Sequence, residues 1–319
     1  MYKIAVLMDP IENVNPRSDS TIIILEKLQK KADIFYIEPD SFALVNSNIE
    51  ANISKLKVSR LKKNFYTLTN KKKTLLANMD ALFFRTDPPV DDHYLNIAHI
   101  LKALENKGVL IINSPSAISL MNEKILGDCF SPENLPSIVS NNKKLIKKFM
   151  DHYNTIVLKP MNLMAGKNIF KTSKKDKDFD AKLNLAQNKI KKNYIIAQKY
   201  LDVEKHGDMR VIIYNGKVYN KGLLRFPKKG EFRANLACGG NYKIASVEKS
   251  MLKHLEITAG ILKSNGIYLA GVDIIDKYIT EINITSPTGI VQLDKNNANL
   301  AQKISNELFS LIKMNKDGR

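Results

Sequence analysis

Three side chains with oxygen donors lie in the segment Gly271–Gly289 at a spacing that suits a metal site. Side chains of a strand alternate between its two faces, so Glu281 and Asn283 share one face. Asp273 precedes the turn Asp276-Lys277-Tyr278, and a three-residue hairpin loop would set it opposite Glu281 on that face. Two carboxylates and one amide oxygen would then converge from neighbouring strands.

This donor set favours a hard divalent cation. Mg²⁺ prefers oxygen ligands, keeps several waters and takes further ligands from substrate phosphates. The alternative is an ordinary solvated hairpin face. The apolar residues interleaved with the donors predict a buried opposite face and so favour the metal site: Ile274, Ile275, Ile279, Ile282 and Ile284.

Two lysines lie beside segments that could contact a phosphate. Lys159 ends an apolar strand and is followed by the loop Pro160–Gly166. An ammonium group and the backbone N–H groups of such a loop both stabilise phosphate charge. Lys124, in Asn122-Glu123-Lys124, is a second candidate. An ordinary surface lysine is the alternative for each.

Arginines carry more weight because the chain otherwise prefers lysine. Arg210 and Arg225 lie on two predicted strands joined by the turn Asn215-Gly216, a strong hairpin signal. Arg233 and Asn235 follow shortly before a Gly-Gly pair. Guanidinium groups bind phosphate and carboxylate through two parallel hydrogen bonds. Strand salt bridges with an ordinary glycine turn are the alternative.

Other catalytic signatures are absent from the sequence. It contains no HExxH, no cysteine pair and no GxxxxGK[ST], so an ordinary P-loop is excluded. Two lysines, several arginines and a carboxylate hairpin together favour phosphoryl transfer by positioning and electrostatic stabilisation.

The composition is that of a globular protein: 319 residues with 44% hydrophobic and 8% aromatic content allow two or three domains. The formal charge is +18, but the lysines are spread over most polar segments, which favours general lysine enrichment over a nucleic-acid surface. Cys129 and Cys238 are too few and too separated for a disulfide framework, so a cytoplasmic location is expected. No apolar run approaches the roughly 18 residues that cross a bilayer, and no membrane partner is expected.

Alternating strands and helices near the N-terminus predict a parallel sheet with helices on its faces. The expected strands are Lys3–Met8, Asp33–Ile37, Ala81–Phe84 and Val109–Ile112. The expected helices are one capped by Ser18 and one over Asp91–Lys107. Asn46–Lys73 shows no clear pattern.

The later part of the chain predicts helices and antiparallel strands. The strands are Pro136–Val139, Thr155–Lys159, Tyr194–Gln198 and a hairpin over Arg210–Leu224. The helices are Ser116–Leu126, Asn142–His152, an exposed lysine-rich helix within Lys171–Lys192, Lys249–Asn265 with Gly266 as C-cap, and Asn297–Met314.

Several motifs together give the chain a resemblance to bacterial glutathione synthetases, which are ATP-grasp carboxylate–amine ligases, over nearly its whole length. The motifs are Met8-Asp9-Pro10-Ile11, Arg85-Thr86-Asp87-Pro88-Pro89, Asn113-Ser114-Pro115, Asn122-Glu123-Lys124, Gly207-Asp208-Met209-Arg210, Arg233–Gly240 and Thr280–Thr288. The resemblance implies an α/β ATP-grasp fold. It also implies an N-terminal α/β domain over residues 1–122, a central lid over 123–201 and a C-terminal antiparallel-sheet domain over 202–319.

The resemblance also implies roles for individual residues. Catalytic roles fall to Lys159, Arg210 and Arg225. ATP contacts fall to Lys124, Lys159, Gly166, Gln198, Lys199, Tyr200, Leu201 and Asp208. Substrate contacts fall to Arg85, Arg233, Asn235, Gly239, Gly240 and Ser286. Asp273, Glu281 and Asn283 would hold Mg²⁺ or Mn²⁺.

The implied reaction joins γ-glutamylcysteine to glycine through an acylphosphate and yields glutathione, ADP and phosphate. The implied partners are small molecules and further copies of the chain in a tetramer. Two departures from the family pattern are visible: Asn162–Gly166 keeps one glycine of a glycine-rich loop, and Gly289–Gln292 replaces a segment with an Arg-Glu pair. They leave two alternatives open, another ATP-grasp ligase or a catalytically weakened nucleotide-binding relative.

Overall fold

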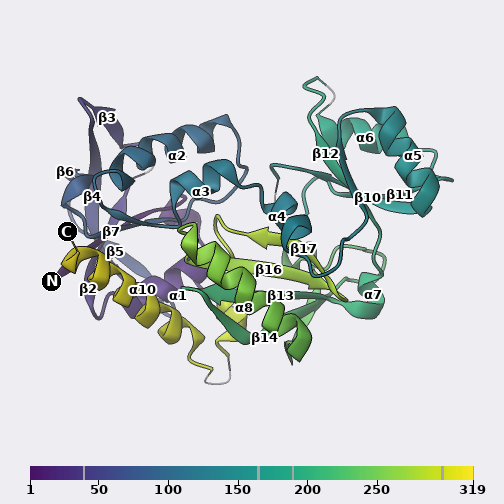
Figure 1. Cartoon of the computed structure of the whole chain (residues 1–319). Coiled ribbons are helices and arrows are strands. Elements are labelled where there is room, and N and C mark those ends of the chain that lie inside the picture. Colours follow the sequence, from purple (N-terminus) through teal and green to yellow (C-terminus); the bar gives the residue numbers. More distant parts are fainter. Residues whose placement is uncertain (39, 164–165, 189, 296–297, 319) are drawn as a thin grey trace.

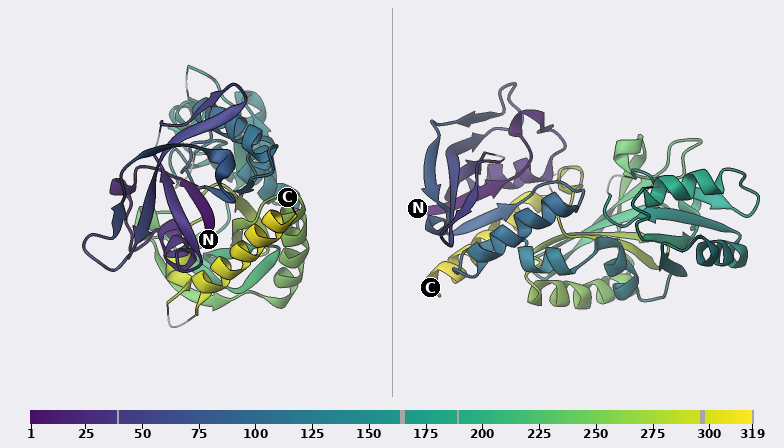
Figure 2. Two further views of the ribbon diagram at one scale, coloured as in Figure 1. Left: turned by 90° about the vertical axis from the view of Figure 1, so that its left-hand side faces the viewer. Right: turned by 90° about the horizontal axis from the view of Figure 1, so that it is seen from above.

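Three β-sheets organise the chain (Figure 1). The structure is a computed structural model that describes residues 1–38, 40–163, 166–188, 190–295 and 298–318. The smallest sheet and its two helices project to one side of the two larger sheets in both Figure 1 and the view from above in Figure 2. The two chain ends lie close together at the N-terminal sheet (Figure 2).

The N-terminal sheet has the strand order β3-β4-β2-β1-β7-β8, with β5 and β6 also paired to β4. Its parallel strands are those predicted: β1 (Tyr2–Leu7), β2 (Ala32–Ile37), β7 (Ala81–Phe84) and β8 (Leu110–Ile112). The stretch without a clear pattern adds the antiparallel strands β3 (Ala43–Val45), β4 (Asn48–Val58), β5 (Tyr66–Leu68) and β6 (Lys72–Leu75). The predicted parallel pairing of these four strands is therefore confirmed, and the segment left without an assignment makes the sheet mixed.

Helices cover both faces of this sheet. On one face lie α1 (Ser20–Leu28) and α10 (Leu300–Asp317), and on the other lie α2 (Asp92–Glu105) and α3 (Pro115–Leu120). Asp19, not Ser18, caps α1, because its carboxylate accepts the N–H of Ile22 at 2.7 Å. The predicted start of α10 at Asn297 lies outside the described residues.

The single helix predicted over Ser116–Leu126 is two helices. After α3 the chain turns at Met121, and α4 (Glu123–Phe130) begins with Asn122 as its N-cap. The Asn122 side chain accepts the N–H groups of Lys124 and Ile125. This cap sets Lys124 in the first turn of α4, at the edge of the site described below.

The smallest sheet has the order β11-β10-β12-β9 and is antiparallel. Its strands are β9 (Ser137–Ser140), β10 (Thr155–Pro160), β11 (Phe170–Ser173) and β12 (Ile195–Lys199). The helices α5 (Lys143–Tyr153) and α6 (Phe179–Gln187) cover one face and share a hydrophobic cluster with it. The helix predicted within Lys171–Lys192 is α6, but Lys182 is its only lysine and the other lysines of the segment flank it. Phe179 and Leu183 of α6 are buried.

The C-terminal sheet has the order β15-β14-β13-β16-β17 and is antiparallel. Its strands are β13 (Asp208–Tyr214), β14 (Lys217–Phe226), β15 (Asn241–Ser246), β16 (Leu269–Ile275) and β17 (Tyr278–Asn283). Positive φ angles at Asn215 and Gly216 confirm the predicted tight turn between β13 and β14. The helix α8 (Lys249–Ser264) covers one face, and Gly266 follows it with φ +76° as predicted.

Short helical segments complete the list of elements. They are α7 (Val203–His206), α9 (Ile290–Leu293) and the 3-10 turns η1 (Ile11–Asn13), η2 (Leu76–Asn78) and η3 (Leu236–Cys238). Among the described helices, none combines the length and apolar character that a bilayer crossing needs.

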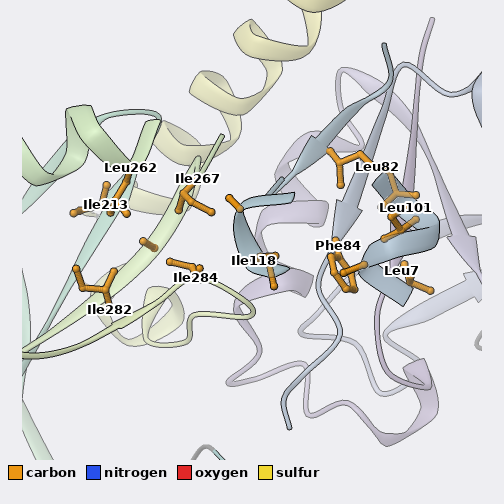
Figure 3. Packing of buried hydrophobic residues seen from close by; sticks show 14 of the residues in the cluster. Leu7, Leu82, Phe84, Leu101, Ile118, Ile213, Leu262, Ile267, Ile282 and Ile284 are labelled. Atoms are coloured by element: carbon orange, nitrogen blue, oxygen red, sulfur yellow. The ribbon is translucent and has the colours of Figure 1, made fainter. Parts of the chain in front are cut away.

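The two larger sheets share their hydrophobic cores, whereas the smallest sheet has its own. Figure 3 follows one cluster from Leu82 and Phe84 through Ile118 to Ile213 and Ile282. A second cluster also joins both larger sheets through α1 and α10. The third cluster contains only residues from Ile146 to Ala197, together with partly buried neighbours of the same region. The smallest sheet can therefore move against the rest without breaking a shared core.

Candidate active site

One cavity of about 530 Å³ lies between the smallest sheet and the C-terminal sheet. This volume is in the range of small-molecule sites. Of the predicted site residues, Arg85, Gly239 and Gly240 do not line it. Those that line it are Lys124, Lys159, Gly166, Gln198, Lys199, Tyr200, Leu201, Asp208, Arg210, Arg225, Arg233, Asn235, Asp273, Glu281, Asn283 and Ser286.

The hairpin of β16 and β17 turns the three predicted metal ligands toward this cavity. Asp273 pairs with Glu281 across the strands, and Gly271 pairs with Asn283. The opposite face is buried as predicted, since Ile274, Ile279, Ile282 and Ile284 belong to the hydrophobic core. The prediction for Ile275 was wrong, because its side chain lines the cavity.

The loop of this hairpin differs from the predicted one. Tyr278 already pairs with Ile275, so the loop has two residues instead of three. Thr280 is then an extra residue in β17, and the resulting bulge restores the pairing of Asp273 with Glu281. The predicted juxtaposition of the two carboxylates is thus reached by a different register.

Four charges on β13, β14 and β16 form one network, of which Arg210, Arg225 and Asp273 are buried and Asp208 is partly buried. Asp273 accepts Arg210 Nε at 2.8 Å and Arg210 Nη2 at 2.6 Å. Arg225 Nη2 lies 2.8 Å from the Asp273 carboxylate and 2.7 Å from that of Asp208. The pairing explains this, because Arg210 lies opposite Asp273 and Arg225 opposite Asp208. Both guanidinium groups are therefore held at fixed positions beside the cavity.

The two carboxylates of this network respond differently to burial. Burial alone would raise the pKa of Asp273, but Arg210 and Arg225 outweigh it and hold this pKa below its ordinary value. For Asp208 burial is the larger effect, so its pKa is raised although Arg225 opposes the shift. Asp273 is the firmly ionised partner of both arginines.

Lys124 connects the hairpin to the loop that follows β10. Its side chain is buried, with Nζ 3.1 Å from the Glu281 carboxylate. The same Nζ donates to the carbonyl of Leu163 at 2.7 Å. A single ammonium group therefore holds a predicted metal ligand and a predicted phosphate-binding loop near each other.

Lys159 lies across the cavity on β10 and donates to Gln198 Oε1 at 2.6 Å. Burial lowers the pKa of Lys159, and the charge of Glu281 opposes this shift. Lys159 is partly buried, so its ammonium group interacts with an anion more strongly than it would in bulk water.

The loop after Lys159 is held largely through its carbonyl groups. The carbonyl of Asn162 accepts the N–H of Val90 at 3.1 Å, and that of Gly166 accepts Arg233 Nη1 at 2.8 Å. These contacts do not depend on the loop side chains; positions 164 and 165 lie outside the described residues. Gly166 has φ +76° and keeps the glycine that such a backbone favours.

Arg233 and Asn235 belong to a loop that borders the cavity. Hydrogen bonds from Arg233 hold the pKa of Glu231 at about 2. Glycine is needed at position 240, because a Cβ there would lie only 2.6 Å from the carbonyl oxygen of Ala234 in this loop. Gly239 has φ +82°, so the Gly-Gly pair shapes the loop from outside the cavity.

Arg85 is also placed outside the cavity and is almost fully buried. Its guanidinium group donates to Thr21 Oγ1 at 3.0 Å and to the carbonyls of Thr285 at 3.3 Å and Pro287 at 3.2 Å. It therefore holds the backbone on both sides of Ser286, which does line the cavity.

Two residues of this site were missed in the sequence. Glu123 is half-buried at the cavity wall, and its Oε1 accepts the N–H groups of Ile284 at 2.7 Å and Thr285 at 3.0 Å. Burial, followed by the charge of Glu281, raises the pKa of Glu123. Thr288 accepts Arg210 Nη1 at 3.1 Å through its hydroxyl. Both lie inside recognised motifs, but only the fold reveals what they contact.

The donor chemistry of the hairpin fits a divalent cation. Within the described ranges, no three His, Cys, Asp or Glu side chains gather as a metal cluster. The hairpin instead offers two carboxylates and the amide of Asn283, whose Nδ2 lies 3.3 Å from Asp273 Oδ2. These are three oxygen-bearing groups on one face of two paired strands, the kind of set that Mg²⁺ accepts when phosphate oxygens and water complete the shell.

Two family models match the chain over most of its length. The N-terminal domain of prokaryotic glutathione synthetase matches residues 2–119, and the ATP-grasp domain of prokaryotic glutathione synthetase matches residues 123–298. Glutathione synthetase of Buchnera aphidicola subsp. Schizaphis graminum is 35% identical over 294 residues, which are 92% of each chain. Glutathione synthetase of Escherichia coli K12 is 33% identical over 298 residues, 92% of this chain and 93% of the relative.

Solved structures share the fold at low sequence identity. A D-cycloserine synthetase is 12% identical with a TM-score of 0.67, covering 97% of this chain and 99% of that chain. D-alanyl-alanine synthetase A from Vibrio cholerae is 14% identical with a TM-score of 0.64, covering 98% of each chain. At this low sequence identity, the two structures confirm the predicted fold and nothing further. Together, the two matching domain models and relatives aligned over 92% of the sequence establish that this chain belongs to the prokaryotic glutathione synthetase family and has the ATP-grasp fold.

Proposed function

We propose that this protein joins γ-glutamylcysteine to glycine with hydrolysis of ATP to ADP and phosphate. The observation that carries the proposal is the gathering of Lys124, Lys159, Arg210, Arg225 and the carboxylate hairpin around one cavity of a member of this family. Such a set stabilises negative charge on phosphate, which is what phosphoryl transfer to a carboxylate requires.

The nucleotide would lie between the smallest sheet and the C-terminal sheet. Val157, Ile169 and Ile275 give that part of the cavity apolar walls for a base, next to the strand end Gln198–Leu201. Lys124 and Lys159 would meet the phosphates. Asp208 lines the same region and would contact the nucleotide between base and phosphates.

The hairpin would hold the divalent cation, Mg²⁺ or Mn²⁺, through Asp273, Glu281 and Asn283. When bound, the cation neutralises phosphate charge and orients the phosphate groups. The carboxylates are paired with arginine and lysine. Those cations keep the donors in place and are themselves available to phosphate oxygens when the ligands bind.

The chemistry has two steps. The cysteinyl carboxylate of γ-glutamylcysteine attacks the γ-phosphorus of ATP, and ADP leaves. The amine of glycine, having lost a proton, then attacks the acyl carbon, and phosphate leaves with formation of the amide. Arg210 and Arg225 would stabilise the charge on the transferred phosphoryl group and on the tetrahedral intermediate, because strand pairing fixes both guanidinium groups.

The dipeptide would bind at the end of the cavity lined by Arg233, Asn235 and Ser286. Arg85 would act on it indirectly, by holding the carbonyls that flank Ser286. Exclusion of water from the acylphosphate would fall to the loop after Lys159, in which the carbonyls of Leu163 and Gly166 accept hydrogen bonds from Lys124 and Arg233.

We further propose the division into units 1–122, 123–201 and 202–319, a cytoplasmic location and assembly into homo-oligomers. The separate core of the smallest sheet supports treating the middle unit as a lid. Ile257 and Ile261 are exposed on the outer face of α8 and would suit a contact between copies. Light scattering of the purified protein would test the assembly.

The decisive experiment supplies ATP, Mg²⁺, γ-glutamylcysteine and glycine and measures glutathione and ADP together. Equal amounts of both products are expected, and omission of either amino substrate should stop ADP release. ADP without glutathione would indicate a ligase with another acid or amine. Neither product, with ATP still bound, would identify a weakened nucleotide-binding relative. Glu50→Gln, at an exposed ion pair with Lys73, is the matched control for charge removal.

A further inference from the structure

A chain of hydrogen bonds leads from Lys159 out of the cavity into α4. Lys159 Nζ donates to Gln198 Oε1 at 2.6 Å. Gln198 Nε2 donates in turn to Asp128 Oδ1 at 3.0 Å. The hydroxyl of Ser137 donates to the other oxygen of the same carboxylate. Asp128 does not line the cavity, so it acts on a ligand only indirectly, through its hydrogen bond to Gln198 and through its charge, which favours the ammonium form of Lys159.

The sheet explains why these groups meet. Gln198 on β12 lies directly opposite Val157 on β10 and opposite Ser137 on β9. Lys159 is two residues beyond Val157 and shares its face, so the lysine is a diagonal neighbour of Gln198. Asp128 reaches this face from α4, the helix whose first turn carries Lys124.

The carboxylate decides which way the amide of Gln198 points. A glutamine side chain can present either its oxygen or its NH₂ group to a neighbour, and the two arrangements have almost the same shape. An ionised carboxylate only accepts hydrogen bonds, so Nε2 must face Asp128 and Oε1 must face Lys159. The reversed amide would direct two N–H donors at an ammonium group in a poorly solvated site.

We propose that Asp128 is a positioning residue for Lys159, acting through the amide of Gln198, and that Ser137 fixes the carboxylate for this task. The inference rests on the proposed role of Lys159 as a phosphate contact. Loss of the carboxylate removes the acceptor that holds Gln198 Nε2, so the amide, and the ammonium group that donates to it, are no longer held at one position beside the phosphates. The contact of the nucleotide base with the cavity walls does not depend on this chain of hydrogen bonds.

Nucleotide binding to the whole protein tests the proposal without relying on turnover. Dissociation constants for ATP and for adenosine are measured by calorimetry for the parent, Asp128→Ala, Asp128→Asn and Ser137→Ala. Asp180→Ala is the control, because Asp180 forms an exposed ion pair with Lys143 and does not line the cavity. A misplaced charged hydrogen bond predicts about ten- to hundredfold weaker ATP binding by Asp128→Ala. Adenosine affinity should stay within about twofold of the parent, since adenosine has no phosphate.

The other variants separate positioning from simple stabilisation. Asp128→Asn should recover most of the ATP affinity, because its oxygen can accept from Gln198 while its NH₂ donates to the Ser137 hydroxyl. Ser137→Ala should also weaken ATP binding without changing adenosine binding, but by a smaller factor than Asp128→Ala. This variant tests the proposal even if Asp128→Ala does not fold.

Three results would overturn the inference. Unchanged ATP affinity in both Asp128→Ala and Ser137→Ala would show that Lys159 needs no such support. Equal losses for ATP and adenosine would mean that Asp128 merely connects α4 to β9. If the parent protein bound ATP no more tightly than adenosine, the role of Lys159 as a phosphate contact would be refuted. Both this inference and the proposed function would then fail.

Discussion

Asp273→Asn is the sharpest test of the charge network, because it removes one charge and almost no volume. In the parent, this carboxylate is 4% exposed and lies within 2.8 Å of nitrogen atoms from two guanidinium groups. The variant leaves Arg210 buried without its ionic partner, while Arg225 keeps Asp208. Breaking a buried ion pair on one side costs about 3–5 kcal/mol, and the remaining partner of Arg225 points to the lower end.

The expected loss translates into a clear shift in thermal unfolding. At about 2 °C per kcal/mol for a chain of this size, the ligand-free variant should unfold roughly 6–10 °C below the parent. Differential scanning calorimetry at pH 7 measures this directly. The control Glu50→Gln breaks an ion pair whose lysine is 72% exposed, and it should lower the free energy of unfolding by no more than about 1 kcal/mol.

The pH dependence of the stability difference between the parent and Asp273→Asn is a second, independent test. The pKa of Asp273 is lower in the folded protein than its ordinary value of 3.8, so the folded state favours its ionised form. Its contribution is fully present above pH 3.8 and disappears as pH falls through the lowered folded value. Parent and variant should therefore differ by a constant amount from pH 5 to 8 and converge only in acid. A variant as stable as Glu50→Gln at pH 7 would refute the argument that Asp273 supports the arginines.

Three further predictions concern the cavity. Glu281→Gln should keep the fold and lower ligation at least about a hundredfold, because a metal ligand loses its charge; near-normal turnover at ordinary Mg²⁺ would remove the hairpin from the mechanism. Burial lowers the pKa of Lys159 from 10.5, so kcat/KM for ATP should fall as pH rises through that lowered value. Lys159→Arg should not show this fall, because arginine does not titrate in that range. The same fall in both proteins would show that another group causes it. Gly127→Ala places a Cβ 2.7 Å from the Thr280 carbonyl carbon and should destabilise the protein by about 1–3 kcal/mol in urea unfolding; an unchanged midpoint would mean that the hairpin adapts at no cost.

The parts that the sequence predicted well depend on local periodicity. Alternation alone put Glu281 and Asn283 on one face, and a turn before them was enough to bring Asp273 across. The loop length was wrong, yet the Thr280 bulge compensated for it, and a bulge leaves no reliable mark in a single sequence. The helix caps were predictable within one residue, as Asp19 in place of Ser18 illustrates.

What could not be predicted depends on distant segments meeting. Asn48–Val58 pairs with four other strands along its two edges, and the alternation of its buried residues changes phase at Ser54. Arg85 looked like a ligand contact because it is an arginine in a motif, but its partners are carbonyls two hundred residues later in the chain. Asp128 gave no signal in the sequence, since its hydrogen bonds with Gln198 and Ser137 join segments that meet only in the fold.

The separate hydrophobic cluster of the smallest sheet has a consequence for unfolding. A segment that shares no core with its neighbours can open as its own cooperative unit, at a lower free energy than global unfolding. Amide hydrogen exchange should therefore resolve two classes of protected amides. The amides of β9, β10 and β12 would exchange through subglobal opening, whereas those of β1, β13 and β16 would exchange only with the whole protein. A nucleotide held between the two units would raise the protection of the first class toward the second and so convert two unfolding events into one.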